Sequence, residues 1–215
     1  MMPVVPDGSS LGVFVIAALV LLLTPGPAVL YIVTRSIDQG RRAGLVSVLG
    51  VHGGTLAHVF AAAAGLSALL AASATAFSVV KYLGAAYLIY IGVRRLLDRG
   101  ASGPAAAGEP QRLRRTFLDG FVINLLNPKT ALFFLAFLPQ FVTVSRGSVG
   151  EQILVLGLVF VLLGLVTDSL YALSAGSASA WLRGPARVLA GERWISGSLY
   201  IGLGVAAALS SNQRK

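Results

Sequence analysis

Long uncharged apolar runs dominate the hydrophobic pattern of this chain. Residues 11–34 contain no Asp, Glu, Lys or Arg. A helix over this run is long enough to cross about 30 Å of hydrocarbon at a rise of about 1.5 Å per residue. Residues 43–80 are also free of these four residue types, and this stretch is too long for a single helix. The pattern therefore indicates membrane-spanning helices.

Six spans follow from the remaining apolar runs and the Gly, Pro, Ser and Arg residues that separate them. We place them at residues 11–34, 44–66, 77–97, 117–142, 152–176 and 194–211. The third span begins with Lys81 and Tyr82, and the sixth opens with Trp194, residue types that favour the membrane interface. The predicted fold is an all-α membrane protein.

Composition supports the same class. Hydrophobic residues make up 56 % of the 215 residues and charged residues only 12 %, whereas a soluble domain carries about 25 % charged residues. This shortfall excludes a water-soluble globule, and the mean hydropathy of +0.81 excludes a disordered chain. The chain has no Cys, which excludes disulfides, Cys-based zinc sites and iron–sulfur clusters.

The net charge is +9, and the distribution of the basic residues over the connectors indicates which side of the membrane each connector faces. Three Arg lie between the first two spans, six around the connector between the third and fourth, and three between the fifth and sixth. The other connectors and the chain ends hold four basic residues. Because positive loops stay in the cytoplasm, six spans place both termini outside it. We therefore expect the lipid bilayer as a partner, and no nucleic acid.

Two proline-containing segments resemble each other. LLLTPGPAVLYIV begins at Leu21 and NLLNPKTALFFLA begins at Asn124, which aligns Pro25 with Pro128 at an offset of 103 residues. The two segments lie in the first and fourth spans, an offset of three crossings, so they enter the membrane from opposite sides. This parity predicts two inverted three-helix repeats, residues 1–100 and 117–215, joined by a cytoplasmic loop at 101–116. Alternatively the match arises by chance, because Pro and Leu are common in membrane helices.

The prolines interrupt these helices chemically. Pro lacks an N–H, so Pro25, Pro27, Pro128 and Pro139 each release the carbonyl four residues earlier. In hydrocarbon a released carbonyl costs several kcal/mol unless something binds it. One interpretation is ordinary kinks satisfied by neighbouring Ser or Thr. The other, which we favour, is a broken-helix binding site made by both segments. Its candidate substrate-binding residues are Thr24, Pro25, Gly26, Pro27, Asn124, Asn127, Pro128 and Lys129.

Two charged side chains lie deep in predicted spans. Lys129 is about 18 Å into the fourth span at the helical rise, where a charge costs about 2.5–3.5 kcal/mol. It is a candidate receptor for a substrate carboxylate, or else a long side chain that snorkels to the interface. Asp168 lies inside the fifth span. It is a candidate partner for Lys129 and a candidate proton carrier, or else a protonated packing residue.

His52 and His58 in the second span are further candidates for proton coupling, because imidazoles titrate near neutral pH. They are six residues apart and do not share a helical face, so we expect no metal site and no cofactor. Gly50 and Gly54 form a GxxxG pattern that predicts a close helix contact. That contact lies within one chain or between the two copies of a homodimer.

These motifs together resemble the lysine exporter (LysE/RhtB) family of amino-acid efflux proteins. The matching stretches include LLLTPGPAVLYIVTRSIDQGRRAG, KYLGAAYLIYIGVRRL and FLDGFVINLLNPKTALFFLAFLPQFV. The resemblance implies a multi-pass exporter in the bacterial inner membrane that moves an amino acid or close derivative at the expense of the proton gradient. It also implies that residues 24–27 and 127–129 form the functional centre.

Other functions fit the residues less well. Export of a metal ion or another small toxic solute is the alternative transport function, although two separated histidines and no Cys offer soft metals few ligands. A membrane enzyme is not expected, because the chain has no HExxH motif and no carboxylate pair at a useful spacing. A scaffold protein would tolerate loss of the prolines and of Lys129.

Overall fold

The computed structural model describes residues 8–72, 112–143 and 147–178. It also describes isolated positions between 79 and 97 and positions 145, 201 and 205. All regular structure in this part of the chain is helical, which confirms the predicted class. Two helices, Arg41–Gly65 and Val149–Ser177, are long and apolar enough to cross a membrane. Two bent pairs of helices bring the number of candidate spans to four. The predicted third and sixth spans fall almost wholly outside the described residues, so the complete six-span, two-repeat arrangement stays a prediction.

The first bent pair is α1 (Gly8–Leu23) and the start of α2 (Pro27–Ala72), with 52° between the two helices. Gly40 interrupts α2 with φ 82° and ψ 175°, a conformation that glycine adopts without a Cβ clash. The helix after the first break therefore continues to Gln39, beyond the predicted end of the span at residue 34. The connector between the first two spans is thus the turn at this glycine.

The second bent pair is α4 (Leu113–Leu125) and α5 (Pro128–Leu132), with 47° at the break. Residues 113–116, which were expected in the loop, form the first turn of α4. After α5 the chain continues as a π-helix, Phe133–Phe137, and a 3₁₀ helix, Leu138–Phe141. Pro139 lacks an N–H, and such local changes of helix type are the usual response to a missing hydrogen bond.

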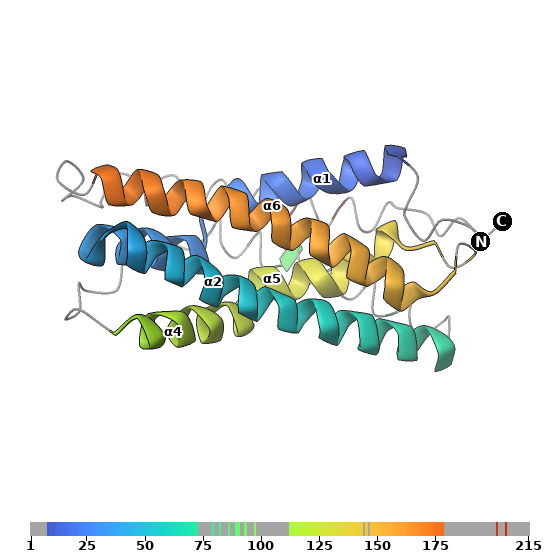
Figure 1. Cartoon of the computed structure of the whole chain (residues 1–215). Coiled ribbons are helices and arrows are strands. Elements are labelled where there is room, and N and C mark those ends of the chain that lie inside the picture. Colours follow the sequence, from blue (N-terminus) through green and yellow to red (C-terminus); the bar gives the residue numbers. More distant parts are fainter. Residues whose placement is uncertain are drawn as a thin grey trace.

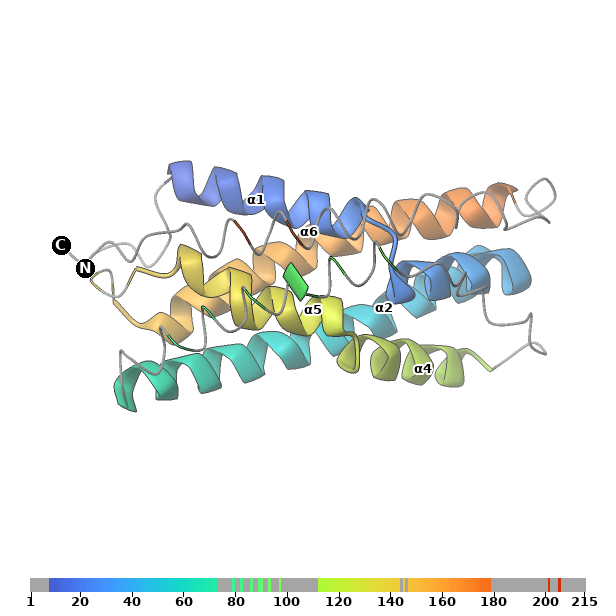
Figure 2. The ribbon, with the colours of Figure 1, turned by 180° about the vertical axis from the view of Figure 1, so that it is seen from behind.

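The helices lie side by side in one bundle, with α6 (Val149–Ala178) packed against both α1 and α2 (Figure 1). The two broken helices run antiparallel. Early in α1, Phe14 lies against Phe141 with ring centroids 5.3 Å apart, whereas after the first break Tyr31 donates a hydrogen bond of 2.8 Å to the carbonyl of Thr116. The view from behind shows α4 and α5 following one another past α2 (Figure 2).

Arginines gather at one end of the bundle. The Gly40 turn, the start of α4 and the end of α6 all lie at this end (Figure 1), and Arg41 Nη2 donates to Ser177 Oγ at 2.8 Å. The described arginines there are Arg35, Arg41, Arg42, Arg112, Arg114 and Arg115. We call this the arginine-rich end.

A close contact between α2 and α4 confirms the contact predicted from the GxxxG pattern, and it lies within one chain. A Cβ added to Gly50 would overlap the carbonyl oxygen of Phe117, and one added to Gly54 would lie 2.7 Å from the carbonyl oxygen of Phe121. The two helix backbones therefore touch directly, as small residues allow in membranes.

We expect Gly50→Ala to destabilise the protein by about 1–3 kcal/mol, because the new methyl group must push α4 away. Gly65→Ala on the same helix is the matched control, since no atom of the described chain lies within 4 Å of a Cβ there. It should be neutral or stabilising by up to about 1 kcal/mol, owing to the better helix propensity of Ala. Thermal unfolding in detergent compares the two. Equal melting temperatures would contradict the close contact.

Candidate functional site

The first break lies at residues 24–26, between α1 and α2. Thr24 closes α1 by donating from its hydroxyl to the carbonyl of Val20 at 2.7 Å, and its N–H lies 3.2 Å from the carbonyls of Val20 and Leu21. The helix restarts at Pro27, where a missing N–H costs nothing at the first helical position. The motif TPGP therefore ends one helix and begins the next.

The second break also ends one helix and starts the next at a Pro, and here a side chain caps the new helix. Asn127 lies in extended conformation before α5, and its Oδ1 accepts a hydrogen bond of 3.0 Å from the N–H of Lys129. Pro128 occupies the first turn of α5. An Asn cap followed by Pro is a strong signal for a helix start, which explains why NPK interrupts the span.

Side chains from other helices satisfy carbonyls released at the breaks. Tyr171 of α6 donates to the carbonyl of Leu23 at 2.8 Å. His58 Nε2 of α2 lies 3.1 Å from the carbonyl of Asn124 and donates to it. The carbonyl of Asn124 also accepts from the N–H of Asn127 at 3.1 Å. Both carbonyls are therefore held by groups of the protein.

Lys129 joins the two breaks. Its side chain is buried, and its Nζ donates a hydrogen bond of 2.5 Å to the carbonyl of Thr24 in the first break. Gly26 lies beside it, because a Cβ there would be 3.4 Å from Lys129 Cδ and 3.6 Å from Nζ. The ammonium thus points into the protein interior, and the side chain does not snorkel to the membrane surface.

Asn124 connects the second break to α2. Its Nδ2 donates to the carbonyl of Val51 at 2.9 Å and to Thr55 Oγ1 at 2.8 Å. Its Oδ1 accepts from Asn127 Nδ2 at 3.2 Å and from Thr130 Oγ1 at 2.9 Å. The amide uses both donor and both acceptor positions. This network fixes the second break against a helix 69–73 residues earlier in the chain.

Asp168, a candidate partner for Lys129 and a candidate proton carrier, pairs with His52. Asp168 Oδ2 lies 3.0 Å from His52 Nε2, and only 4 % and 5 % of the His and Asp side chains are exposed. Gly164 provides the space, because a Cβ there would overlap the His52 ring. Within the described part of the chain, His52 Nδ1 and Asp168 Oδ1 have no hydrogen-bond partner.

His58 lies apart from this pair. Its ring stacks on Phe134 with centroids 6.3 Å apart and an interplanar angle of 5°. The expectation that the two histidines occupy different faces of the helix is confirmed.

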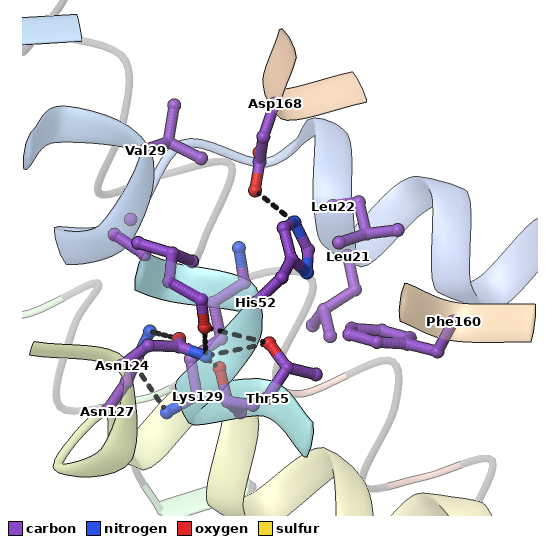
Figure 3. A pocket seen from close by; sticks show the side chains of 14 residues that line it. Leu21, Leu22, Val29, His52, Thr55, Asn124, Asn127, Lys129, Phe160 and Asp168 are labelled. Carbon is purple, nitrogen blue, oxygen red and sulfur yellow. Dashed lines mark hydrogen bonds and ion pairs between the residues drawn. The ribbon is translucent and has the colours of Figure 1, made fainter. Parts of the chain in front are cut away.

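These groups surround one pocket (Figure 3). It is lined by Leu21, Leu22, Gly26, Ala28, Val29, Val51, His52, Thr55, Asn124, Asn127, Lys129, Thr130, Phe160 and Asp168. Of the predicted site residues, Thr24, Pro25, Pro27 and Pro128 shape the breaks beside this pocket without lining it. The substrate-binding and proton-coupling roles of all these residues stay predictions.

Several residues of the site were not predicted. Thr130 follows Lys129 directly in the sequence, and its position beside NPK was the available signal. Tyr171 lies three residues after Asp168, close to one helical turn. Phe160 looked like any other apolar residue of its span, and no sequence signal distinguishes it.

The whole chain is similar to known membrane transporters. A family profile described as "LysE type translocator" matches residues 19–211. The homoserine/homoserine lactone efflux protein of Salmonella typhimurium (strain LT2) is 31 % identical over 195 residues, which is 91 % of this chain and 94 % of the relative. The leucine efflux protein of Enterobacter sp. (strain 638) is 30 % identical over 203 residues, or 92 % and 93 %. An uncharacterized membrane protein of Pseudomonas aeruginosa is 32 % identical over 203 residues, or 92 % and 94 %.

No solved structure matches the chain.

The family profile covers most of the sequence, and the relatives align over nearly their full lengths. Members of this family are transporters and not enzymes. The chain therefore belongs to the LysE family of translocators and is a membrane transporter.

Proposed function

We propose that this protein exports an amino acid or a close derivative across the bacterial inner membrane in exchange for protons. One observation carries the proposal: two antiparallel broken helices meet at the Lys129–Thr24 hydrogen bond, beside a pocket that also holds the His52–Asp168 pair. A cation at a helix break inside a membrane is a typical receptor for an anionic substrate group. Relatives named as homoserine and leucine efflux proteins support the same class of substrate.

The substrate carboxylate binds Lys129 in this proposal. A carboxylate is a stronger acceptor for an ammonium than a peptide carbonyl is, because the hydrogen bond is charge-assisted on both sides. The substrate therefore displaces the Thr24 carbonyl from Lys129 and releases one break from the other. Binding is in this way linked to movement of the two halves. We expect an uncharged substrate side chain, because Leu21, Val29 and Phe160 cover the apolar part of the pocket.

The coupling proton binds at the His52–Asp168 pair. Both groups are buried and titratable, and they lie 3.0 Å apart. His58 is the weaker candidate because its Nε2 is held by the Asn124 carbonyl and the residue does not line the pocket. In the membrane, we propose that the arginine-rich end faces the cytoplasm and that both termini lie outside, as the positive-inside rule requires for six spans.

A substrate screen tests the export function. Cells with and without the protein are fed dipeptides, and the amino acids retained inside them are measured. We expect lower retention of a few uncharged amino acids when the protein is present. Protection against metal salts without any change in retained amino acids would contradict the proposal and favour metal-ion export.

Inverted membrane vesicles test the antiport. Export from the cell corresponds to uptake into these vesicles, and we expect uptake of L-leucine or L-homoserine to stop when nigericin collapses the pH gradient. Uptake that persists without any pH gradient or membrane potential would contradict coupling to protons.

A further inference from the structure

The His52–Asp168 pair presents two polar atoms that its own contact does not use. His52 Nδ1 and Asp168 Oδ1 are buried and lack a partner within the part of the chain that the structure describes. Buried polar groups almost always have hydrogen-bond partners, so two unpaired atoms on one ion pair require an explanation. Both residues line the pocket, and Figure 3 shows the pair above the Asn124 network.

The charges around the pair can be named for each packed helix. Helix α1 carries no titratable residue, and α5 contributes Lys129. On α2, His58 is held by a carbonyl of the second break. On α6, the hydroxyl of Tyr171 donates to a carbonyl of the first break. On α4, Asp119 lies 4.0 Å from Arg115 near the surface. The described pocket lining thus contains one ammonium, one carboxylate and one imidazole.

We propose that Asp168 Oδ1 receives the ammonium group of the substrate, that His52 Nδ1 receives the coupling proton, and that the pocket holds only one of these two cations at a time. This inference rests on the proposed function and specifies its exchange step. With the proton bound, the pair is an imidazolium beside a carboxylate. With the substrate bound, the imidazole is neutral, its Nε2–H still donates to Oδ2, and the ammonium balances the carboxylate.

Electrostatics makes the two cations exclusive. Like charges a few ångströms apart repel strongly where water is scarce, and a buried site that carries an uncompensated charge is unfavourable. Exchanging the proton for the ammonium keeps the charge of the His52–Asp168 pair constant. Binding both would place two cations against the single carboxylate of Asp168, because the substrate carboxylate is engaged at Lys129. The proton therefore leaves His52 Nδ1 for pocket water as the ammonium arrives.

The substrate class follows from these contacts. An α-amino acid places its carboxylate on Lys129 and its ammonium on Asp168, so both ends of the zwitterion are recognised. N-acetylation converts the ammonium into a neutral amide, which cannot replace a proton at the pair. The site should thus reject N-acyl amino acids, even those with the same side chain.

Binding calorimetry on the purified full-length protein tests the inference, with L-leucine, L-homoserine and N-acetyl-L-leucine as probes. Titrations in buffers of different ionisation enthalpy count the protons released. At pH values where the free pair carries the proton, we expect release of about one proton per bound amino acid, and an apparent Kd that weakens roughly tenfold for each unit that pH falls. We expect no binding of N-acetyl-L-leucine.

Two variants locate the proton. His52→Gln keeps a side-chain donor for Asp168 but has no proton site, so it should bind the amino acid with an affinity independent of pH and release no proton. His58→Gln is the matched comparison, and it should still release about one proton on binding. The chain has only two histidines. Imidazole nitrogen NMR of the ¹⁵N-histidine-labelled wild type therefore follows His52 directly, even if the His52 variant fails to fold.

Three results would overturn the inference: no proton release by a wild type that binds and exports amino acids, proton release retained in His52→Gln, or equal affinity for L-leucine and its N-acetyl derivative. Each leaves the proposed export function standing. A wild type that neither binds nor transports either amino acid would instead overturn the proposed function, and the inference would fall with it.

Discussion

Lys129→Met should reduce the initial rate of amino-acid uptake into inverted vesicles by roughly a hundredfold while leaving the protein folded. A charge-assisted hydrogen bond contributes about 1.5–3 kcal/mol, and a factor of ten in rate corresponds to about 1.4 kcal/mol. Stability should change little, because two effects oppose each other. Removing the buried ammonium relieves about 2.5–3.5 kcal/mol, whereas leaving the Thr24 carbonyl unpaired costs about 1–3 kcal/mol.

Arg115→Met provides the matched control for this prediction. Arg115 is a mostly exposed cation, 4.0 Å from Asp119 on the same face of α4, and exposed pairs of this kind contribute about 0.3–0.5 kcal/mol. We expect its loss to leave uptake unchanged. Uptake rates and melting temperatures measured on both variants separate a transport role from a structural one. Wild-type uptake by Lys129→Met would show that this ammonium does not receive the substrate.

Asn124→Ala should have the largest effect on stability, lowering the free energy of unfolding by about 3 kcal/mol or more. The substitution removes four hydrogen bonds of a side chain that is 2 % exposed. The former partners remain buried, and each unsatisfied group costs about 1–3 kcal/mol. Thr55 and Thr130 recover part of this loss by turning their hydroxyls to other acceptors. Unfolding in detergent measures the difference.

Two comparison variants test the cause. Thr167→Val removes a buried hydroxyl whose hydrogen bond among the described residues is local, to the carbonyl of Gly164 at 3.2 Å, and should cost no more than about 1.5 kcal/mol. Asn124→Asp keeps the acceptor but places an oxygen opposite the Val51 carbonyl, so it should also be strongly destabilising. If Asn124→Ala had the same melting temperature as Thr167→Val, the amide network would not hold the second break.

Several expectations from the sequence were correct because they rest on local chemistry. Hydropathy over about twenty residues determines which segments suit the bilayer, and the membrane class followed from it. Pro25 and Pro128 lack an N–H wherever they lie, so both breaks were expected at the positions where the helices bend by 52° and 47°. Gly50 and Gly54 offered a smooth surface, and α4 packs on it.

Other features depend on long-range contacts or on helix ends and could not be predicted from local sequence. His52 lies beside Asp168 from 116 residues away in the sequence, and no sequence signal indicated this contact. The first turn of α4 was assigned to a loop because Arg residues surround it, although arginines at a membrane surface are compatible with a helix. Sequence position alone could not reveal that Tyr171 and His58 would bind the released carbonyls.

The sequence by itself determined that this chain lies in the membrane and that two of its helices are broken. These are properties of short segments, since solvation and backbone donors depend on each residue and its immediate neighbours. Only the tertiary structure decided which side chain meets which break. The rotation and crossing of whole helices set those distances, and a hydrogen bond forms only when donor and acceptor come within about 3 Å.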